Sequence, residues 1–276
     1  MASMTKQAFR WIGFIGSVWA AVFAATSVSA GVDLPCLVKP RVVVAVGSPI
    51  PGLLTQLSVD QGDGVKEGQV LAILESSLEQ TEVDVAKAKA EMEAAIMSTQ
   101  VKAEFSNRKA GRARNLSSSS AIASNEFDEA ETEQRVTEAA HLEALENKVL
   151  AQRQLARAEA ALALRTIRSP IAGLVIERYV SPGELVKEKP ILQLAQLDPL
   201  QVEVLSPVSW LGRFTVGMPI DVKLSHGSPA SHRARVTVIN PIVDSASDTF
   251  RVRLELPNPH YRIPAGVTCT ARLAPQ

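Results

Sequence analysis

The 276-residue chain is poor in aromatic side chains and has no excess of charge of either sign. Phe, Trp and Tyr make up 4% of its residues, and 29 basic residues are balanced by 29 acidic ones. Few aromatic rings leave few platforms for stacking bases, and a neutral chain is not attracted to nucleic acid or to an anionic membrane surface. The composition therefore argues against a nucleic-acid partner.

Motifs that carry chemistry are also scarce. No glycine-rich phosphate loop follows a strand, and there is no nucleophile-elbow sequence and no paired-carboxylate arrangement beyond ordinary helix charges. The four histidines are scattered. His226 and His232 lie six residues apart without a cysteine or methionine cluster, which is a weak metal signature. We expect no enzyme, no bound cofactor and no metal site.

The chain has only two cysteines, Cys36 and Cys269, which lie toward opposite ends of the sequence. In an oxidising compartment two such cysteines can form a disulfide. Sequence alone does not show that they are close in space, so two unrelated cysteines remain the alternative.

Proline is absent from residues 76–165, and glycine occurs there only as Gly111. This stretch is rich in Ala, Glu, Lys, Gln and Arg, the strongest helix formers, and is interrupted by a polar run at 115–120. The pattern predicts an antiparallel helical hairpin over 76–165 with its tip at about 112–128. Limbs of forty residues reach roughly 60 Å. Spacings of three, four and seven predict a coiled-coil core from Leu78, Val85, Met92, Ile96, Ala103 and Ala110 in the first limb, and from Leu142, Leu145, Val149, Ala156 and Ala163 in the second.

Residues 1–30 have the pattern of a secretory signal peptide. Lys6 and Arg10 precede an apolar run at 11–22, and small residues at 28–30 fit a cleavage site before Gly31. The apolar run is short for a membrane span, although an uncleaved anchor is the alternative. We expect a mature protein outside the cytoplasm, in a bacterial periplasm.

The segments on either side of the predicted hairpin resemble each other. Gly52 and Gly62 are ten residues apart, as are Gly173 and Gly183, and similar apolar residues follow each glycine pair. Short β-branched runs with glycine turns predict strands, and the turn glycines supply φ > 0. Residues 31–75 and 166–198 therefore form the two halves of one β-domain that the hairpin interrupts.

Residues 199–276 form a further segment of short strands. The alternation at 250–256 has a period of two, and proline- and glycine-containing turns separate it from a last strand at 267–273. The pattern favours a small β-barrel or a β-sandwich.

The residues at 52–72 and 167–175 resemble the two halves of a biotinyl-lipoyl domain. The whole chain resembles the periplasmic adaptor, or membrane-fusion, family (HlyD-like, as in RND-type efflux). The resemblance implies an elongated α+β fold: a split lipoyl-like β-domain, an inserted coiled-coil hairpin and a small β-barrel. No acceptor lysine remains on the turn that the hairpin replaces, so a cofactor carrier is disfavoured. Because the chain stops at Gln276 directly after the barrel, the resemblance implies a short form lacking the membrane-proximal domain.

The hairpin tip partly matches the motif of adaptors that dock on TolC-like channels. That motif has an arginine, a leucine four residues later, a serine seven residues after that, and an acidic-aromatic-Asp stretch. Arg112, Leu116 and the stretch at 126–128 fit, whereas Ala123 occupies the serine position and Ser124 lies one residue late. The alternative is local: Ser124 or Asn125 caps the second helix.

Arg112, Leu116, Ile122 and Ser124 are accordingly the candidate channel contacts, with Leu116 and Ile122 as exposed apolar groups and Arg112 as a hydrogen-bond donor. The resemblance implies an adaptor of a tripartite efflux pump. It would link an inner-membrane transporter, first of all an RND transporter, to a TolC-like outer-membrane channel, and would self-associate into a hexameric ring. The alternatives are an adaptor of an ABC-type export system and a periplasmic scaffold with no role in transport.

Overall fold

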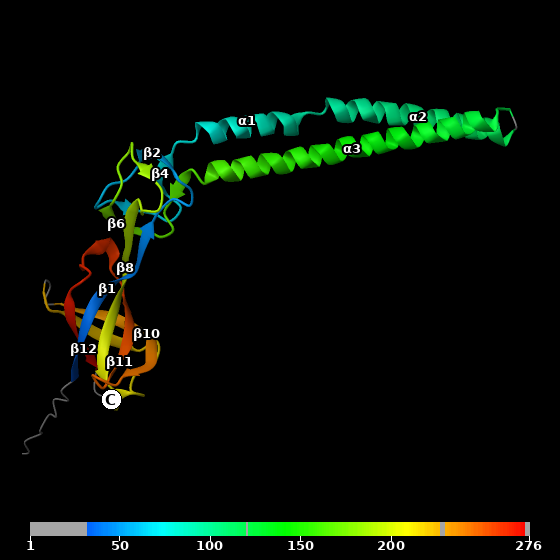
Figure 1. The fold of residues 1–276 in the computed structure, drawn as a ribbon. Coiled ribbons are helices and arrows are strands. Elements are labelled where there is room, and N and C mark those ends of the chain that lie inside the picture. Colours follow the sequence, from blue (N-terminus) through cyan, green and yellow to red (C-terminus); the bar gives the residue numbers. More distant parts are fainter. Residues whose placement is uncertain (1–31, 120, 227–229, 274–276) are drawn as a thin grey trace, which may run out of the picture.

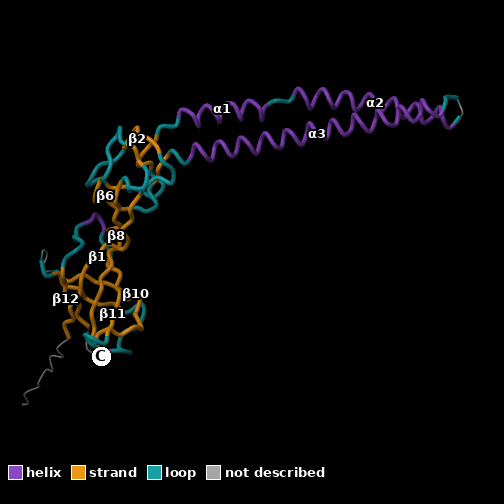
Figure 2. The backbone as a smooth tube through the Cα atoms, in the orientation of Figure 1, coloured by secondary structure: helices purple, strands orange, loops and turns teal. Residues whose placement is uncertain are grey.

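The computed structural model describes residues 32–119, 121–226 and 230–273. The molecule is elongated: a long helical hairpin projects from one β-domain, and a second β-domain continues from the first along strands β1 and β8 (Figures 1 and 2). This is the expected α+β fold. The expected signal peptide, residues 1–30, lies outside the described residues.

The hairpin consists of three helices, α1 (Ser77–Glu91), α2 (Ala94–Ser118) and α3 (Ser124–Ala163). The prediction of a single interruption at 115–120 was wrong in two respects. Helix α2 continues through Ser118, and the first limb has a second break at Met92, whose ψ of 124° is extended. The break changes which face of the first limb points toward α3. Before it, the buried Val83 and Ala90 are seven residues apart, and a continued seven-residue repeat would bury the residue fourteen positions after Ala90; the next buried residue is instead Ala103, thirteen positions on. Each residue of a helix adds 100° of rotation, so in an unbroken helix Ala103 would point away from α3.

Small and polar residues, not large apolar ones, fill the seam between the limbs. Its buried members are Val83, Ala90, Ala103, Ser106, Ala110 and Ala130. The predicted core was therefore mostly wrong: Ala103 and Ala110 are buried, but Leu78, Val85, Met92, Leu142, Leu145, Val149, Ala156 and Ala163 are exposed. Small side chains let the limbs approach closely, and this leaves the large apolar residues on the outside.

Hydrogen bonds and ion pairs set the register of the seam. Ser106 Oγ and Thr137 Oγ1 lie 2.5 Å apart, and Thr99 Oγ1 lies 3.2 Å from His141 Nδ1. Lys148 Nζ contacts Glu93 Oε1 at 2.6 Å, beside the break in the first limb.

The β-domain at the base of the hairpin is built by strands exchanged between its two halves. Before the hairpin come β2 (Gly52–Leu57), β3 (Gly64–Val65) and β4 (Val70–Leu74); after it come β5 (Thr166–Arg168), β6 (Gly173–Arg178) and β7 (Leu185–Val186). Strand β2 pairs with β7, β3 pairs with β6, and β4 pairs with β5. Within the first half β2 also pairs with β4, and the resulting sheet has the order β5-β4-β2-β7, with second-half strands at both of its edges.

The repeated glycines occupy equivalent places in the two halves. Gly62 N donates to Val175 O at 2.9 Å, and Gly183 N donates to Leu54 O at 2.7 Å. Their φ angles are +94° and +92°, in the left-handed region that favours glycine. The internal repeat is thus a local two-fold relation in which each half caps the other.

The second β-domain is a closed barrel. It is formed by β1 (Val32–Val46), β12 (Thr268–Leu273), β9 (Pro219–Leu224), β10 (Ser231–Asp244), β11 (Thr249–Leu256) and β8 (Leu192–Pro207), in that order, and β1 also pairs with β8 to close the ring. Two short 3-10 helices lie at Val208–Trp210 and Pro259–Tyr261. Strand β1 pairs with β8 on both sides of Pro40, so these two long strands belong to both β-domains. The boundary between the domains therefore falls within continuous strands rather than in a linker.

Candidate functional site: the hairpin tip

The end of α2 is closed by its serine cluster. Ser119 Oγ donates to Leu116 O at 2.9 Å, and Ser118 Oγ donates to Asn115 O at 2.7 Å. Ala121 N also donates to Leu116 O at 2.9 Å. The last carbonyls of a helix lack partners within the helix. These serines and the turn provide partners for them, and the Leu116 side chain stays exposed at the tip.

Helix α3 starts without a side-chain cap. Its N-cap residue is Ala123, whose carbonyl accepts bonds from Glu126 N and Phe127 N, and among the described residues no side chain caps the first turn. The alternative that Ser124 or Asn125 is the N-cap is therefore wrong, because both lie inside the helix. Glu126 in the first turn provides a favourable negative charge near the helix N-terminus.

A shallow groove of about 320 Å³ lies between the limbs at the tip. Arg112, Leu116 and Ile122 line it, together with Glu126, Glu129 and Lys109. The structure thus brings together three of the four candidate contacts, whereas Ser124, which is exposed, does not line the groove. Glu126 belongs to the acidic-aromatic-Asp stretch at 126–128 that the sequence indicated, whereas Glu129 was not singled out from the sequence.

The charges at this groove are only partly paired. Lys109 Nζ contacts Glu133 Oε2 at 2.6 Å, and this hydrogen bond, with the charge of Glu133, raises the pKa of Lys109. Arg112 is exposed and takes part in no ion pair within the described residues. Its guanidinium keeps its donors available for a partner, beside two apolar side chains.

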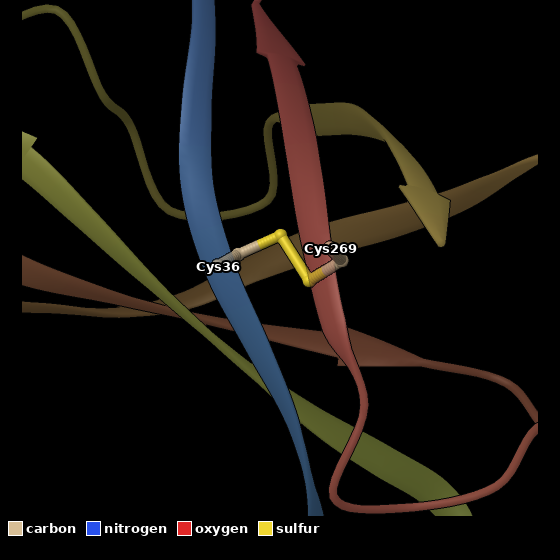
Figure 3. The surroundings of a disulfide bond; sticks show 2 residues. All are labelled: Cys36 and Cys269. Carbon is tan, nitrogen blue, oxygen red and sulfur yellow. A yellow bond between two sulfur atoms is a disulfide. The ribbon is translucent and has the colours of Figure 1, made fainter. Parts of the chain in front are cut away.

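The two cysteines lie on barrel strands β1 and β12 (Figure 3), which are far from the hairpin tip (Figure 1). Cys36 of β1 stands directly opposite Cys269 of β12, with Cα atoms 4.8 Å apart, and their sulfur atoms are joined in the structure. Both side chains are buried. The bond closes a separation of 233 residues and links the first barrel strand to the last.

Comparison with known protein families identifies both β-containing regions. Residues 42–196 match the CzcB-like, barrel-sandwich hybrid domain, and residues 200–276 match the CusB-like, beta-barrel domain. The first match includes the hairpin and the two exchanged halves around it.

Curated relatives extend over most of this chain. It is 26% identical to the pyoverdine export membrane fusion protein PvdR of Pseudomonas aeruginosa over 221 residues, which are 78% of this chain and 56% of that protein. It is 24% identical to a UPF0194 membrane protein of Yersinia pseudotuberculosis over 284 aligned positions, covering 83% of this chain and 85% of the relative. The chain thus spans little more than half of the Pseudomonas protein.

Solved structures show the same fold. MacA from Actinobacillus actinomycetemcomitans superposes with a TM-score of 0.74 at 21% identity, covering 88% of this chain and 78% of MacA. The membrane fusion protein Spr0693 from Streptococcus pneumoniae R6 gives 0.58 at 17% identity, covering 89% of this chain and all of that one.

The split β-domain with its inserted hairpin, followed by a closed barrel, defines a class of elongated adaptors rather than enzymes. The chain belongs to the membrane fusion, or periplasmic adaptor, family. Within residues 32–119, 121–226 and 230–273, no helix has the length and apolar character needed to cross a membrane.

Proposed function

We propose that this chain is the periplasmic adaptor subunit of a tripartite efflux pump. The hairpin tip contacts a TolC-like outer-membrane channel, and the opposite end of the molecule meets an inner-membrane transporter, with an RND transporter as the first candidate. The observation that carries the proposal is the groove at the hairpin tip, where Arg112 lies beside Leu116 and Ile122.

The chemistry of this groove suits the end of a helical partner. An arginine donates several hydrogen bonds to the carbonyls or carboxylates that such an end presents, and adjacent apolar side chains exclude water from those bonds. The names of the relatives support the export role, since one is a pyoverdine export membrane fusion protein.

The proposal also includes the oligomeric state of the chain and its location in the cell. A family adaptor of this kind forms a hexameric ring in the periplasm, after its signal peptide is removed before Gly31. An ABC-type partner in place of the RND transporter, and a scaffold without transport, are the competing functions. Purification of the chain with its membrane partners, followed by their identification, separates the three.

The test is Arg112→Asp, with Arg153→Asp as the control, because Arg153 is an exposed arginine on α3 far from the tip. We expect Arg112→Asp to abolish co-purification with the outer-membrane channel and to abolish export, with an unchanged circular dichroism spectrum. The control should behave as the wild type. Full co-purification and export in the Arg112→Asp variant would refute the channel-docking site.

A further inference from the structure

The β8–β9 connection, residues 208–218, covers the end of the barrel that is farther from the hairpin (Figure 1). Strands β1 and β8 are antiparallel with Cys36 opposite Val204, so the end of β8 at Pro207 lies beside the beginning of β1. At their other ends the same two strands enter the split β-domain that carries the hairpin. The β8–β9 connection therefore lies at the opposite extremity of the molecule from the hairpin tip.

Apolar side chains on the inner side of the β8–β9 connection hold it against the barrel. Phe214 is buried and packs edge-to-face on Phe250 of β11, with ring centroids 5.8 Å apart. Trp210 and Met218 are partly buried and pack against the barrel core. Backbone hydrogen bonds tie the two ends of the connection to β10 and to the β10–β11 turn. The connection thus has a defined conformation, and its remaining side chains are presented from fixed positions.

Two β-turns expose the aliphatic side chains of the β8–β9 connection. Leu211 is 52% exposed, at the centre of a turn closed by a 3.0 Å hydrogen bond from Arg213 N to Trp210 O. Val216 is 69% exposed, at the centre of a second turn at 215–218. In both turns a glycine with positive φ follows the aliphatic residue, the residue that a type II turn requires at that place. Turn centres in water are usually polar, so aliphatic groups at both of them indicate an apolar partner.

The β8–β9 connection contains a single charged residue, Arg213. Its guanidinium carbon lies 4.8 Å from the centroid of the Trp210 ring. Arg213 is exposed, so its hydrogen-bond donors face solvent while the aromatic ring lies beneath them. An arginine of this kind can bind a phosphate at a water boundary while the neighbouring ring and aliphatic groups leave water.

We infer that the β8–β9 connection inserts its two turns into the surface of a phospholipid bilayer. Leu211 and Val216 enter the apolar layer below the headgroups, Trp210 lies at the interface, and Arg213 binds a lipid phosphate. Tryptophan is the side chain that favours this interface, because its ring is apolar and its N–H is polar. The connection has no carboxylate that would lose its hydration on insertion.

The chemistry of the β8–β9 connection favours a bilayer over a protein partner. A protein interface carries about one hydrogen bond per 100–200 Å², and this connection offers few polar side chains to make them. Insertion into a bilayer requires only apolar groups with a cation at headgroup level. Asp244 and Asp248 lie at the same end of the barrel, beside the end of β8, so burial of apolar groups rather than net charge drives the binding. That this end faces a membrane rests on the proposed function.

Tryptophan fluorescence tests the inference, because Trp210 is the only tryptophan in residues 31–276. The secreted chain, purified after removal of residues 1–30, is mixed with phosphatidylcholine vesicles. We expect the emission to shift to shorter wavelength and to be quenched by lipids brominated on their acyl chains. Adding phosphatidylglycerol should change the affinity little. Unchanged emission without quenching would overturn the inference, and binding that requires phosphatidylglycerol would contradict apolar insertion as its cause.

A double variant with a matched control locates the contact. Leu211→Ser with Val216→Ser retains Trp210 and should lower the vesicle partition coefficient about ten-fold, because two aliphatic side chains no longer leave water. Val43→Ser with Leu185→Ser is the control, since these residues are 47% and 59% exposed in the split β-domain. The control should bind vesicles as the wild type does, and all proteins should have the same circular dichroism spectrum. Equal partitioning of the Leu211, Val216 variant and the wild type would refute the assignment.

Co-purification with the membrane partners is measured separately, since Arg112 is unchanged in all these variants. Vesicle binding without co-purification of a channel or a transporter supports the inference and contradicts the proposed function. Co-purification of both without vesicle binding contradicts the inference and leaves the function standing. If the Leu211, Val216 variant then also lost the transporter, the β8–β9 connection would be a protein contact and not a lipid contact.

Discussion

Arg165 forms an ion pair with Glu79 and thereby joins the last turn of the hairpin to its first. The Arg165 Nη1 atom also donates to Pro51 O at 3.3 Å, and its carbonyl accepts a bond from Leu74 N at 2.9 Å. Both side chains of the pair are largely shielded from solvent. One arginine therefore ties both limbs to the β-domain, and the hairpin leaves the domain in a defined direction because of it.

The Arg165–Glu79 ion pair should make the free energy of unfolding depend on pH. The hydrogen bond from Arg165 is the main cause that lowers the pKa of Glu79. Because the folded-state pKa is below the unfolded one, the pair stabilises the fold above the unfolded pKa of about 4.3, and this contribution is lost as the pH falls through the folded value. We expect Glu79→Gln to lower the unfolding temperature at pH 7 and to have little effect at about pH 3.

Thermal unfolding across this pH range is the measurement. Glu82→Gln on the same helix is the control, because Glu82 is exposed and has no ion pair within the described residues. An unfolding-temperature difference between the wild type and Glu79→Gln that is the same at both pH values would contradict the prediction.

A side chain at Gly173 should clash with the backbone where β6 pairs with β8. A Cβ atom at this position would lie 2.3 Å from Ala195 O, a backbone atom that cannot move aside freely. Overpacking of this kind costs about 1–3 kcal/mol, so Gly173→Ala should lower the free energy of unfolding by that amount. Gly64→Ala on the neighbouring strand is the control, since among the described residues no atom outside its adjacent residues lies within 4 Å of its Cβ position. Equal denaturant midpoints for the two variants would show that the strands adjust without cost.

The sequence predicted the fold where glycine and proline constrain the backbone. The spacing of Gly52, Gly62, Gly173 and Gly183 identified the split domain, because the left-handed turns at Gly62 and Gly183 leave few alternatives. The break at Met92 was not predictable in this way. The residues around it are strong helix formers, and the cause of the break is the phase of the seam with α3, which is a tertiary property.

The residues of the candidate site were predicted from a sequence motif, but their arrangement in space depends on how α3 lies against α2. Arg112 and Leu116 lie four residues apart on one helix, so their proximity was implied by sequence. Ile122, Glu126 and Glu129 join them because of the position of α3 along α2, which has no local signal in the sequence. Ala123 instead of serine at the motif position coincides with the N-cap of α3, where it makes no side-chain bond.

The Cys36–Cys269 bond is proposed to form in the oxidised protein and to stabilise the barrel. A cross-link over so long a loop restricts the unfolded chain, and removal of such a bond typically costs about 2–4 kcal/mol. We expect dithiothreitol to lower the unfolding temperature of the wild type. The Cys36→Ala, Cys269→Ala double variant should unfold at the lower temperature with or without reductant. Two free thiols per chain in the unfolded, unreduced wild type would contradict the bond.

The last prediction concerns the small residues in the seam between the two limbs of the hairpin. Ala110 of α2 is 1% exposed, whereas Ala156 of α3 is exposed, although their sequence patterns are equally suited to a core position. Ala110→Leu adds three carbon atoms where the limbs touch, so it must force them apart at a cost of about 1–3 kcal/mol. Ala156→Leu adds the same atoms to the surface and should change the unfolding free energy by less than about 0.5 kcal/mol. Urea unfolding followed by circular dichroism measures both. If Ala156→Leu were the more destabilising variant, the assignment of the small residues to the seam would be wrong, and the large apolar residues would form it.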